Sequence, residues 1–139
     1  MDSINESNPN KDTKSALSTL WIFATLNYLY CDILGFFDAN ILNKLLTGYM
    51  GSIQLTQGFL LASSVLMEIP ISMIVLSRVL KYNVNRWANL VAAAVMTVVQ
   101  TSSLFSGTTP TLYYIFFSLI EITCTLYIAW TAWKWVKQP

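Results

Sequence analysis

Four long apolar stretches limit the folds that this chain can adopt. They run from about Leu17 to Phe37, Leu55 to Ser77, Trp87 to Phe105 and Leu112 to Trp133. Each has roughly 20 residues, the length that an α-helix needs to cross the ~30 Å hydrocarbon core of a bilayer. The stretches lack the polar alternation of barrel strands, so a helix is the form that satisfies their backbone inside lipid. The sequence therefore predicts an all-α membrane protein, with a four-helix antiparallel bundle over residues 16–135.

Composition supports a membrane protein and excludes several other classes. The chain of 139 residues is 55% hydrophobic and only 11% charged, which is too few charges for the surface of a soluble domain of this size. A net charge of +1 gives no support for nucleic-acid binding. Histidine is absent, and Cys31 and Cys124 form no CxxC motif. We therefore expect no metal site, no cofactor and the lipid bilayer as the main partner.

The basic residues predict one orientation in the plasma membrane. Seven lie before the first span, between the second and third, or after the fourth, and only Lys44 lies on the other side: Lys11, Lys14, Arg78, Lys81, Arg86, Lys134 and Lys137. The positive-inside rule then places both termini in the cytoplasm, with residues 1–15 as a disordered tail and 136–139 as a second tail. All five tryptophans are expected to anchor the cytoplasmic interface: Trp21, Trp87, Trp130, Trp133 and Trp135.

The two outer connections differ in character. Residues 106–110, Ser-Gly-Thr-Thr-Pro, predict a tight turn between the third and fourth spans. The segment from Asp38 to Gln54 is longer and carries an apolar stripe at helical spacing. Asp38 is suited to cap a helix and Gly48 to end it. This predicts a short amphipathic helix on the outer side of the bundle.

Three acidic residues lie inside the spans: Asp32 in the first, Glu68 in the second and Glu121 in the fourth. A carboxylate near the bilayer centre costs about 3 kcal/mol on insertion scales. The apolar stretches contain no lysine or arginine to pair with these acids. Protonation, hydrogen bonds or a bound cation must offset this cost, and intramembrane acids more often serve function than structure.

Polar residues recur at helical spacing in each span. The rows are Asn27 with Cys31 beside Tyr28 with Asp32, then Gln57, Ser64, Glu68 and Ser72, then Asn89 with Gln100, and finally Tyr114, Ser118, Glu121 and Thr125. Polar atoms facing lipid would be unsatisfied, so we expect all four rows to face the bundle interior. The ligand or ion candidates are therefore Asp32, Glu68, Glu121, Gln100, Asn27 and Gln57. No residue is a candidate catalytic group.

Two further features of the spans concern packing. Pro70 lies two residues after Glu68 and should kink the second helix by freeing the Leu66 carbonyl, which either belongs to the site or only serves packing. Gly58 with Ala62, and Ala88 with Ala92, are small-xxx-small pairs that allow helices to approach closely. They could serve packing within the chain or a homodimer.

Several short stretches carry a family resemblance that covers about Leu17 to Trp135. They are Met67-Glu68-Ile69-Pro70, Ser77-Arg78-Val79-Leu80-Lys81-Tyr82, Asn85-Arg86-Trp87-Ala88-Asn89 and Pro110-Thr111-Leu112-Tyr113-Tyr114. The chain resembles a family of uncharacterised prokaryotic four-helix membrane proteins, with a layout loosely similar to the DoxX-like group. The resemblance implies a four-helix membrane fold and no established activity or catalytic residues. DoxX itself is associated with quinone-linked oxidation.

Three functions remain open on the sequence. The first is a membrane protein with an acidic cavity that binds or transports a proton, a small cation or an amphiphilic ligand. The second is an accessory subunit whose acids only fix helix register. The third is an enzyme that uses two carboxyls as acid and base on a lipid or quinone. No nucleophile, metal motif or cofactor fingerprint supports an enzyme, so we rank the binding or transport function first.

Overall fold

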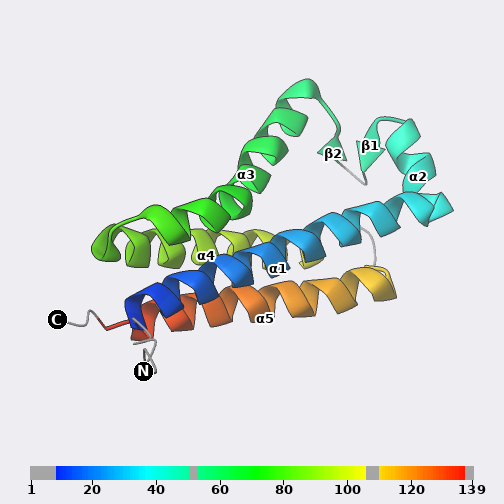
Figure 1. Ribbon diagram of the computed structural model, residues 1–139. Helices are drawn as coiled ribbons and strands as arrows, with labels where there is room; N and C mark the ends of the chain where they lie inside the picture. The colour runs from blue at the N-terminus through cyan, green and yellow to red at the C-terminus, as the bar shows by residue number, and fades with distance from the viewer. Residues whose placement is uncertain (1–8, 51–52, 106–109, 137–139) are drawn as a thin grey trace, which may run out of the picture.

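Four long antiparallel helices form the body of the protein (Figure 1). The computed structural model describes residues 9–50, 53–105 and 110–136. The long helices are α1 (Pro9–Phe37), α3 (Gln57–Val79), α4 (Tyr82–Phe105) and α5 (Leu112–Lys134). All four are long and apolar enough to cross a membrane. The predicted all-α class and the four spans are thereby confirmed.

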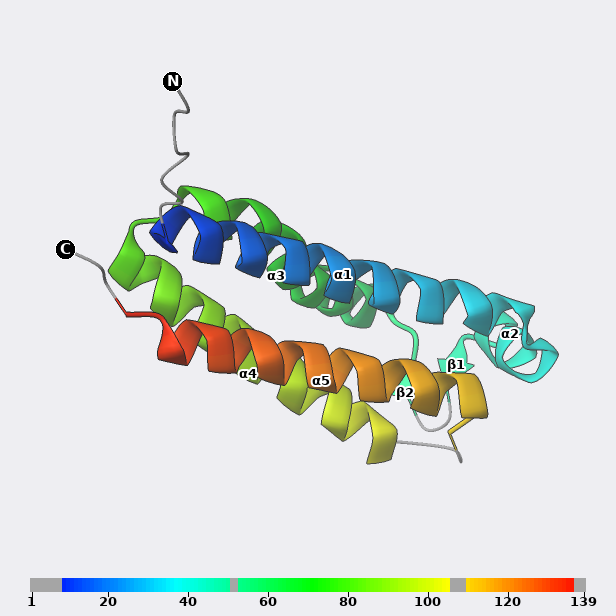
Figure 2. The same ribbon diagram turned by 60° about the horizontal axis from the view of Figure 1, so that its bottom comes forward.

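Helices α1 and α5 define the two ends of the bundle (Figure 2). The first begins and the second finishes at the same end, which we call the terminal end, and α2 lies at the opposite end, the loop end. Lys44 in α2 is at the loop end, whereas Lys14, Arg78, Lys81, Arg86 and Lys134 are at the terminal end. The cytoplasmic orientation of the terminal end and the kind of membrane stay predictions.

Helix α1 begins at Pro9, earlier than predicted. The expected disordered tail of residues 1–15 is therefore wrong for residues 9–15, which are helical, and residues 1–8 lie outside the described part of the chain. Proline favours the first position of a helix, and Asp12 supports the first turn by its charge. The Lys14 ammonium then ties this turn to α3 by donating to the Leu80 carbonyl at 2.6 Å.

The outer segment folds as a helix followed by a small hairpin. Helix α2 (Ala39–Leu46) is capped by the Asp38 carboxylate, which accepts from the Asn40 amide at 2.9 Å. Gly48 follows with a φ of 77°, which favours glycine. This confirms the predicted short helix between the first two long helices, while its outer location stays a prediction. The antiparallel pair β1 (Tyr49–Met50) and β2 (Ile53–Gln54) was not predicted. The predicted turn over residues 106–110 lies outside the described residues except for Pro110.

The long helices pack in a ring, and α3 leaves the ring in its first half. Helix α1 packs against α3 and α5, and α4 packs against the same two helices. Figure 1 shows α3 bending away toward the loop end. Its buried residues, Pro70, Met73 and Ser77, all lie in the second half. Proline removes a backbone hydrogen bond within the helix, which explains the bend. Gly58 and Ala62 are exposed on the diverging half, so this pair does not serve packing within the chain.

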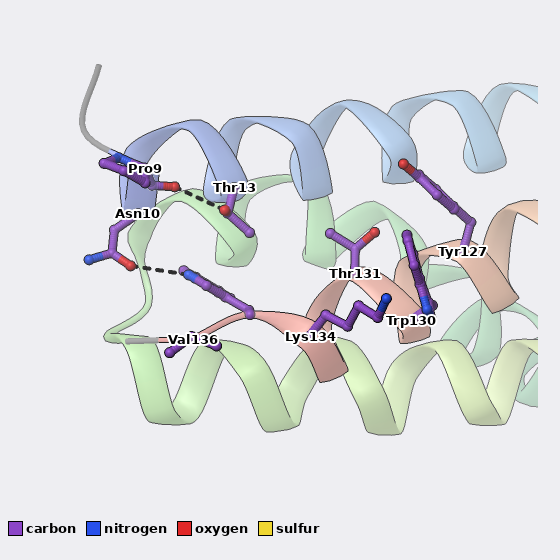
Figure 3. Close-up of a pocket in the computed structure, with 9 residues that line it drawn as sticks. Pro9, Asn10, Thr13, Tyr127, Trp130, Thr131, Lys134 and Val136 are labelled. Carbon is purple, nitrogen blue, oxygen red and sulfur yellow. Dashed lines mark hydrogen bonds between the residues drawn. The ribbon is translucent and has the colours of Figure 1, made fainter. Parts of the chain in front are cut away.

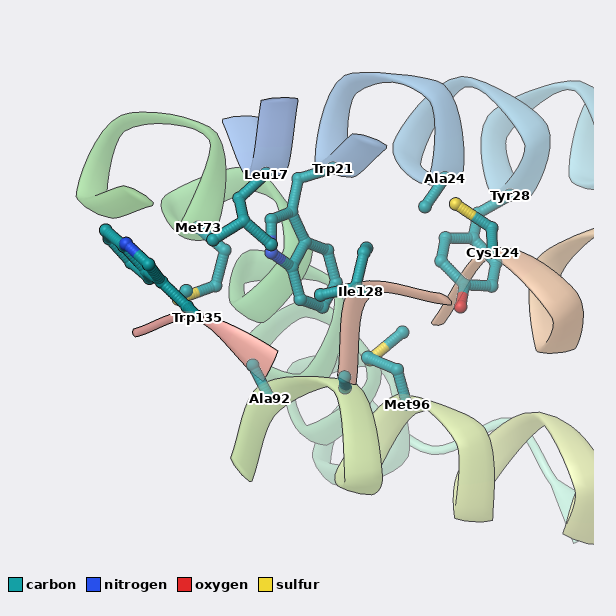
Figure 4. Packing of buried hydrophobic residues seen from close by; sticks show 11 residues of the cluster. Leu17, Trp21, Ala24, Tyr28, Met73, Ala92, Met96, Cys124, Ile128 and Trp135 are labelled. Carbon is teal, nitrogen blue, oxygen red and sulfur yellow. The ribbon is translucent and has the colours of Figure 1, made fainter. Parts of the chain in front are cut away.

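The hydrophobic core lies along one row of α1 (Figure 4). Leu17, Trp21, Ala24, Tyr28 and Cys31 are all buried and recur at steps of four, three, four and three. Partners from the other three long helices pack against this row: Met73, Ala92, Met96, Cys124 and Ile128. Trp21 is 0% exposed, so its expected role as an interfacial anchor is wrong.

Trp21 instead belongs to a buried polar group that we call the asparagine network: Trp21, Ser77, Asn85 and Asn89. The Asn89 side-chain oxygen accepts from Trp21 Nε1 at 2.7 Å and from Ser77 Oγ at 3.2 Å. Its amide nitrogen donates to the side-chain oxygen of Asn85 at 2.7 Å, and Asn85 donates to the Ser77 carbonyl at 2.6 Å. These contacts join α1, α3 and α4 in the terminal half of the bundle.

The C-terminal turn of α5 is closed by side chains from α4. Arg86 Nε donates to the Ala132 carbonyl at 3.2 Å, and a terminal guanidinium nitrogen donates to the Trp133 carbonyl at 3.0 Å. The Tyr82 hydroxyl donates to the Trp135 carbonyl at 2.7 Å. The last carbonyls of a helix lack partners within the helix and attract positive charge. Arg86 and Tyr82 therefore hold the start of α4 to the end of α5.

Replacing Asn89 should destabilise the bundle. Asn89→Leu leaves the buried Trp21 N–H and the Ser77 hydroxyl without their acceptor, and such a loss costs about 1–3 kcal/mol. We expect the free energy of unfolding in detergent to fall by about 2 kcal/mol. The control Asn83→Leu changes an exposed residue of the same helix. Equal stability of the two variants would show that the network does not support the fold.

Candidate functional site

Glu121 is the most unusual polar residue of the bundle. It lies on α5 and is 1% exposed. Neither of its carboxyl oxygens has a hydrogen-bond partner among the described residues. Buried polar groups in native proteins are nearly always hydrogen-bonded, and an isolated buried charge costs far more than a neutral group. A buried carboxyl without a partner is therefore expected where a protein must bind something.

The surroundings of Glu121 come from α1 and from the first half of α5. Tyr28 is 6% exposed, and its hydroxyl also lacks a hydrogen-bond partner among the described residues. Electrostatic interactions link the Glu121 carboxyl with Asp32, Tyr28, Cys31 and Tyr114. We call these five residues the carboxyl cluster. Figure 4 shows Tyr28 at the edge of the hydrophobic core, beside Cys124 of α5.

Contacts between α4 and α5 hold the Glu121 face of α5 in place. The hydroxyls of Thr97 and Thr125 lie 2.8 Å apart. Gln100 Nε2 donates to Ser118 Oγ at 2.8 Å. Gln100, one of the candidate ligand residues, therefore joins α4 to α5 in this structure. The row Ser118, Glu121 and Thr125 is buried, so this part of the predicted inward face is confirmed.

A third hydrogen bond between α4 and α5 lies nearer the loop end. The hydroxyls of Ser103 on α4 and Tyr114 on α5 lie 2.6 Å apart. Tyr114 also belongs to the carboxyl cluster. These three hydrogen bonds between α4 and α5 therefore hold the segment of α5 that carries Tyr114 and Glu121.

Asp32 lies at the margin of the cluster and not inside it. Its side chain is exposed, whereas Tyr28, one turn earlier on α1, is buried. Asp32 is five residues before the end of α1, which corresponds to about 7.5 Å along the helix. Glu121 is nine residues from the start of α5, or about 13.5 Å. Asp32 is thus the acid nearer the loop end, and Glu121 is the deeper one.

Asn27 does not join the cluster. Its side-chain amide donates to the Phe23 carbonyl of its own helix at 2.8 Å. The buried row of α1 passes through Tyr28 and Cys31, and Asn27 lies beside this row. Tyr28 was not among the candidate residues. The apolar spacing from Leu17 to Cys31 was the signal that could have identified it.

The candidate residues of α3 are not brought to Glu121. Gln57, Ser64 and Glu68 are exposed, so the expected inward row on this helix is wrong. Glu68 accepts a hydrogen bond from Ser72 of its own helix at 3.3 Å. Two features explain this. Pro70, Met73 and Ser77 form the buried face of α3, and Glu68 lies about 200° around the helix from Pro70. The first half of α3, which carries Gln57 and Ser64, also bends away from the ring.

Two hollows in the described part of the chain are not lined by any residue of the carboxyl cluster. One, of about 410 Å³, lies between α1 and α5 at the terminal end (Figure 3). A second is an apolar hollow on α4, along Trp87 and Val91. Within the described residues, no group of three or more His, Cys, Asp or Glu could hold a metal ion. The chemistry available at Glu121 is that of one carboxyl beside one phenol, which suits a proton better than a multivalent ion.

Comparison with known proteins places the chain in a family whose function is unknown. The chain matches the model of a family of unknown function, DUF6326, over residues 4–139. No curated protein and no solved structure matches the chain.

If the isolation of Glu121 is functional, its removal should not weaken the fold. Glu121→Met keeps a similar side-chain length and removes a buried carboxyl that has no partner, so we expect the free energy of unfolding in detergent to stay equal or rise by about 1–3 kcal/mol. The control Thr125→Val removes a bonded hydroxyl from the next turn and should lower it by about 1 kcal/mol. A clear loss of stability in Glu121→Met would instead indicate that the carboxyl supports the fold.

Proposed function

Because the chain belongs to this family of unknown function, the site itself must indicate the activity, and we propose that the protein binds and transports protons or small cations at an intramembrane carboxyl. Glu121 is the binding group in this proposal, and a proton is the ligand that its surroundings favour. The single observation that carries the proposal is the burial of both Glu121 oxygens without a hydrogen-bond partner among the described residues.

In this proposal Asp32 is the first acid on the route to Glu121. Asp32 is exposed and lies near the loop end, five residues before the end of α1. Tyr28 lies on the same helix, one turn deeper, with a hydroxyl that can donate or accept. A proton taken up at Asp32 would pass the Tyr28 hydroxyl before it reaches Glu121. Chains of acidic and hydroxyl groups of this kind are typical of intramembrane proton relays.

The terminal half of the bundle is expected to act as the fixed part. The asparagine network is fully buried and bonded, and Arg86 and Lys14 close the ends of α5 and α3. The first half of α3 contains none of the buried residues of that helix, and it lies toward the loop end. Movement of this half would change access to the bundle while the network stays intact, as in proteins that move about an element end.

An accessory subunit is the second candidate function, and the exposed face of α3 favours it. Glu68, Ser64 and Gly58 lie on the diverging half and face away from the bundle. Glu68 is eleven residues from either end of α3, so its carboxyl lies near the middle of the span. Its one hydrogen bond comes from Ser72 of the same helix, and a second membrane chain, including a homodimer partner, would supply a further partner for a carboxyl at this depth.

Proton uptake by reconstituted protein tests the first proposal. In liposomes with an internal pH dye and an imposed potential, the wild-type protein should carry protons, and Glu121→Gln should reduce the rate at least about tenfold because it removes the carboxyl. Glu68→Gln is the matched control, since it removes the exposed carboxyl of α3 and should leave the rate unchanged.

Infrared difference spectra give a second readout for the same variants. A carboxyl band that changes with pH in the wild type, disappears in Glu121→Gln and remains in Glu68→Gln would support the assignment. Wild-type transport that Glu121→Gln leaves intact would overturn it. If only Glu68→Gln changes a property, and that property is association with another chain, the accessory function is favoured.

A further inference from the structure

The hollow at the terminal end has a chemistry of its own, separate from the carboxyl cluster (Figure 3). It lies between the start of α1 and the last turn of α5 and has a volume of about 410 Å³. Among its lining residues are Thr13, Tyr127, Trp130, Thr131, Lys134 and Trp135. The lining includes one basic residue and no acidic one, which gives the hollow a positive charge.

Two donors in the hollow are available to an anion. The Lys134 ammonium lies 4.3 Å from the centre of the Trp130 ring, so it is held over an aromatic wall. The Thr131 hydroxyl is buried and has no hydrogen-bond partner among the described residues. Figure 3 shows Thr13 of α1 across from Thr131 of α5, with Lys134 extending toward Trp130. An ammonium and a hydroxyl in one hollow are suited to a phosphate oxygen.

The aromatic wall indicates the rest of the ligand. Tyr127 and Trp130 form a tilted aromatic pair with their centroids 5.6 Å apart. Trp130 lies one turn, and Tyr127 two turns, from Lys134 toward the middle of α5. Their rings are about half exposed. Tryptophan and tyrosine near a helix end mark the depth of lipid headgroups. A ligand that binds here thus meets a positive charge at the helix end and aromatic surface deeper in the membrane.

We propose that this hollow binds the phosphate headgroup of an anionic phospholipid, with Lys134 and Thr131 as donors and with Tyr127 and Trp130 against the first part of its acyl chains. The charge of the hollow selects an anionic over a zwitterionic lipid. Anionic lipids attract basic residues at the membrane surface by about 1 kcal/mol for each lysine, which corresponds to about fivefold in affinity. The proposal is independent of proton transport at Glu121.

Lipid binding to the detergent-purified full chain, measured by native mass spectrometry, tests the proposal. Phosphatidylglycerol should bind more tightly than phosphatidylcholine. Lys134→Gln should lower the affinity for phosphatidylglycerol about fivefold. Lys81→Gln is the matched control, because it removes the same charge at the same end from an exposed residue outside the hollow. Thr131→Val, which keeps the shape of the side chain, should also lower the affinity for phosphatidylglycerol.

Three results would overturn the proposal. Equal effects of Lys134→Gln and Lys81→Gln would mean that charge at this end acts without a defined site. Equal binding of both lipids to the wild type would remove the role of charge. Protection against thermal unfolding by inorganic phosphate alone, as large as that by phosphatidylglycerol, would assign the hollow to a free anion. If Lys134→Gln does not fold, Thr131→Val with unchanged lipid affinity would overturn the proposal equally.

Discussion

The hydrogen bond from Trp21 to Asn89 organises the terminal half of the bundle. It joins α1 to α4 at 2.7 Å, and Ser77 of α3 donates to the same oxygen. In a hydrocarbon environment such polar groups have no water to turn to, so each must find its partner within the protein. Only one relative rotation and height of the three helices satisfies all of them. Apolar packing of Leu17 and Met96 then follows the arrangement that the polar contacts define.

Two buried groups in the loop-end half of the same bundle differ from this pattern. Glu121 and Tyr28 are buried, yet their carboxyl and hydroxyl oxygens are without hydrogen-bond partners among the described residues. Buried polar groups in native proteins are nearly always hydrogen-bonded, so this difference between the two halves is the observation on which the proposed role of Glu121 rests. The proline bend of α3 strengthens this division, because it leaves the first half of that helix outside the ring.

Local patterns predicted much of this structure correctly. Stretch length predicted the four spans, Asp38 and Gly48 predicted the bounds of α2, and helical spacing predicted the buried row of Ser118, Glu121 and Thr125. The predictions were wrong where one type of residue or segment can have two roles. Trp21 resembled an interfacial anchor and is a buried donor, and residues 9–15 resembled a polar tail and form the first turns of α1, where Lys14 reaches the end of α3. A single sequence contains no signal for the partner that decides between such roles.

The sequence alone determined the all-α class, the four long apolar helices and the position of each acid along its helix, because hydropathy and helix rise depend only on local order. Tertiary structure alone decided which acids meet. Glu68 and Glu121 lie near the middle of their helices, and helical spacing made both equally good candidates. Helix α3 packs through Pro70, Met73 and Ser77, which leaves Glu68 on its exposed face, while packing of α5 against α1 buries Glu121. Which face of a helix points inward depends on its neighbours, and the helix's own sequence does not contain them.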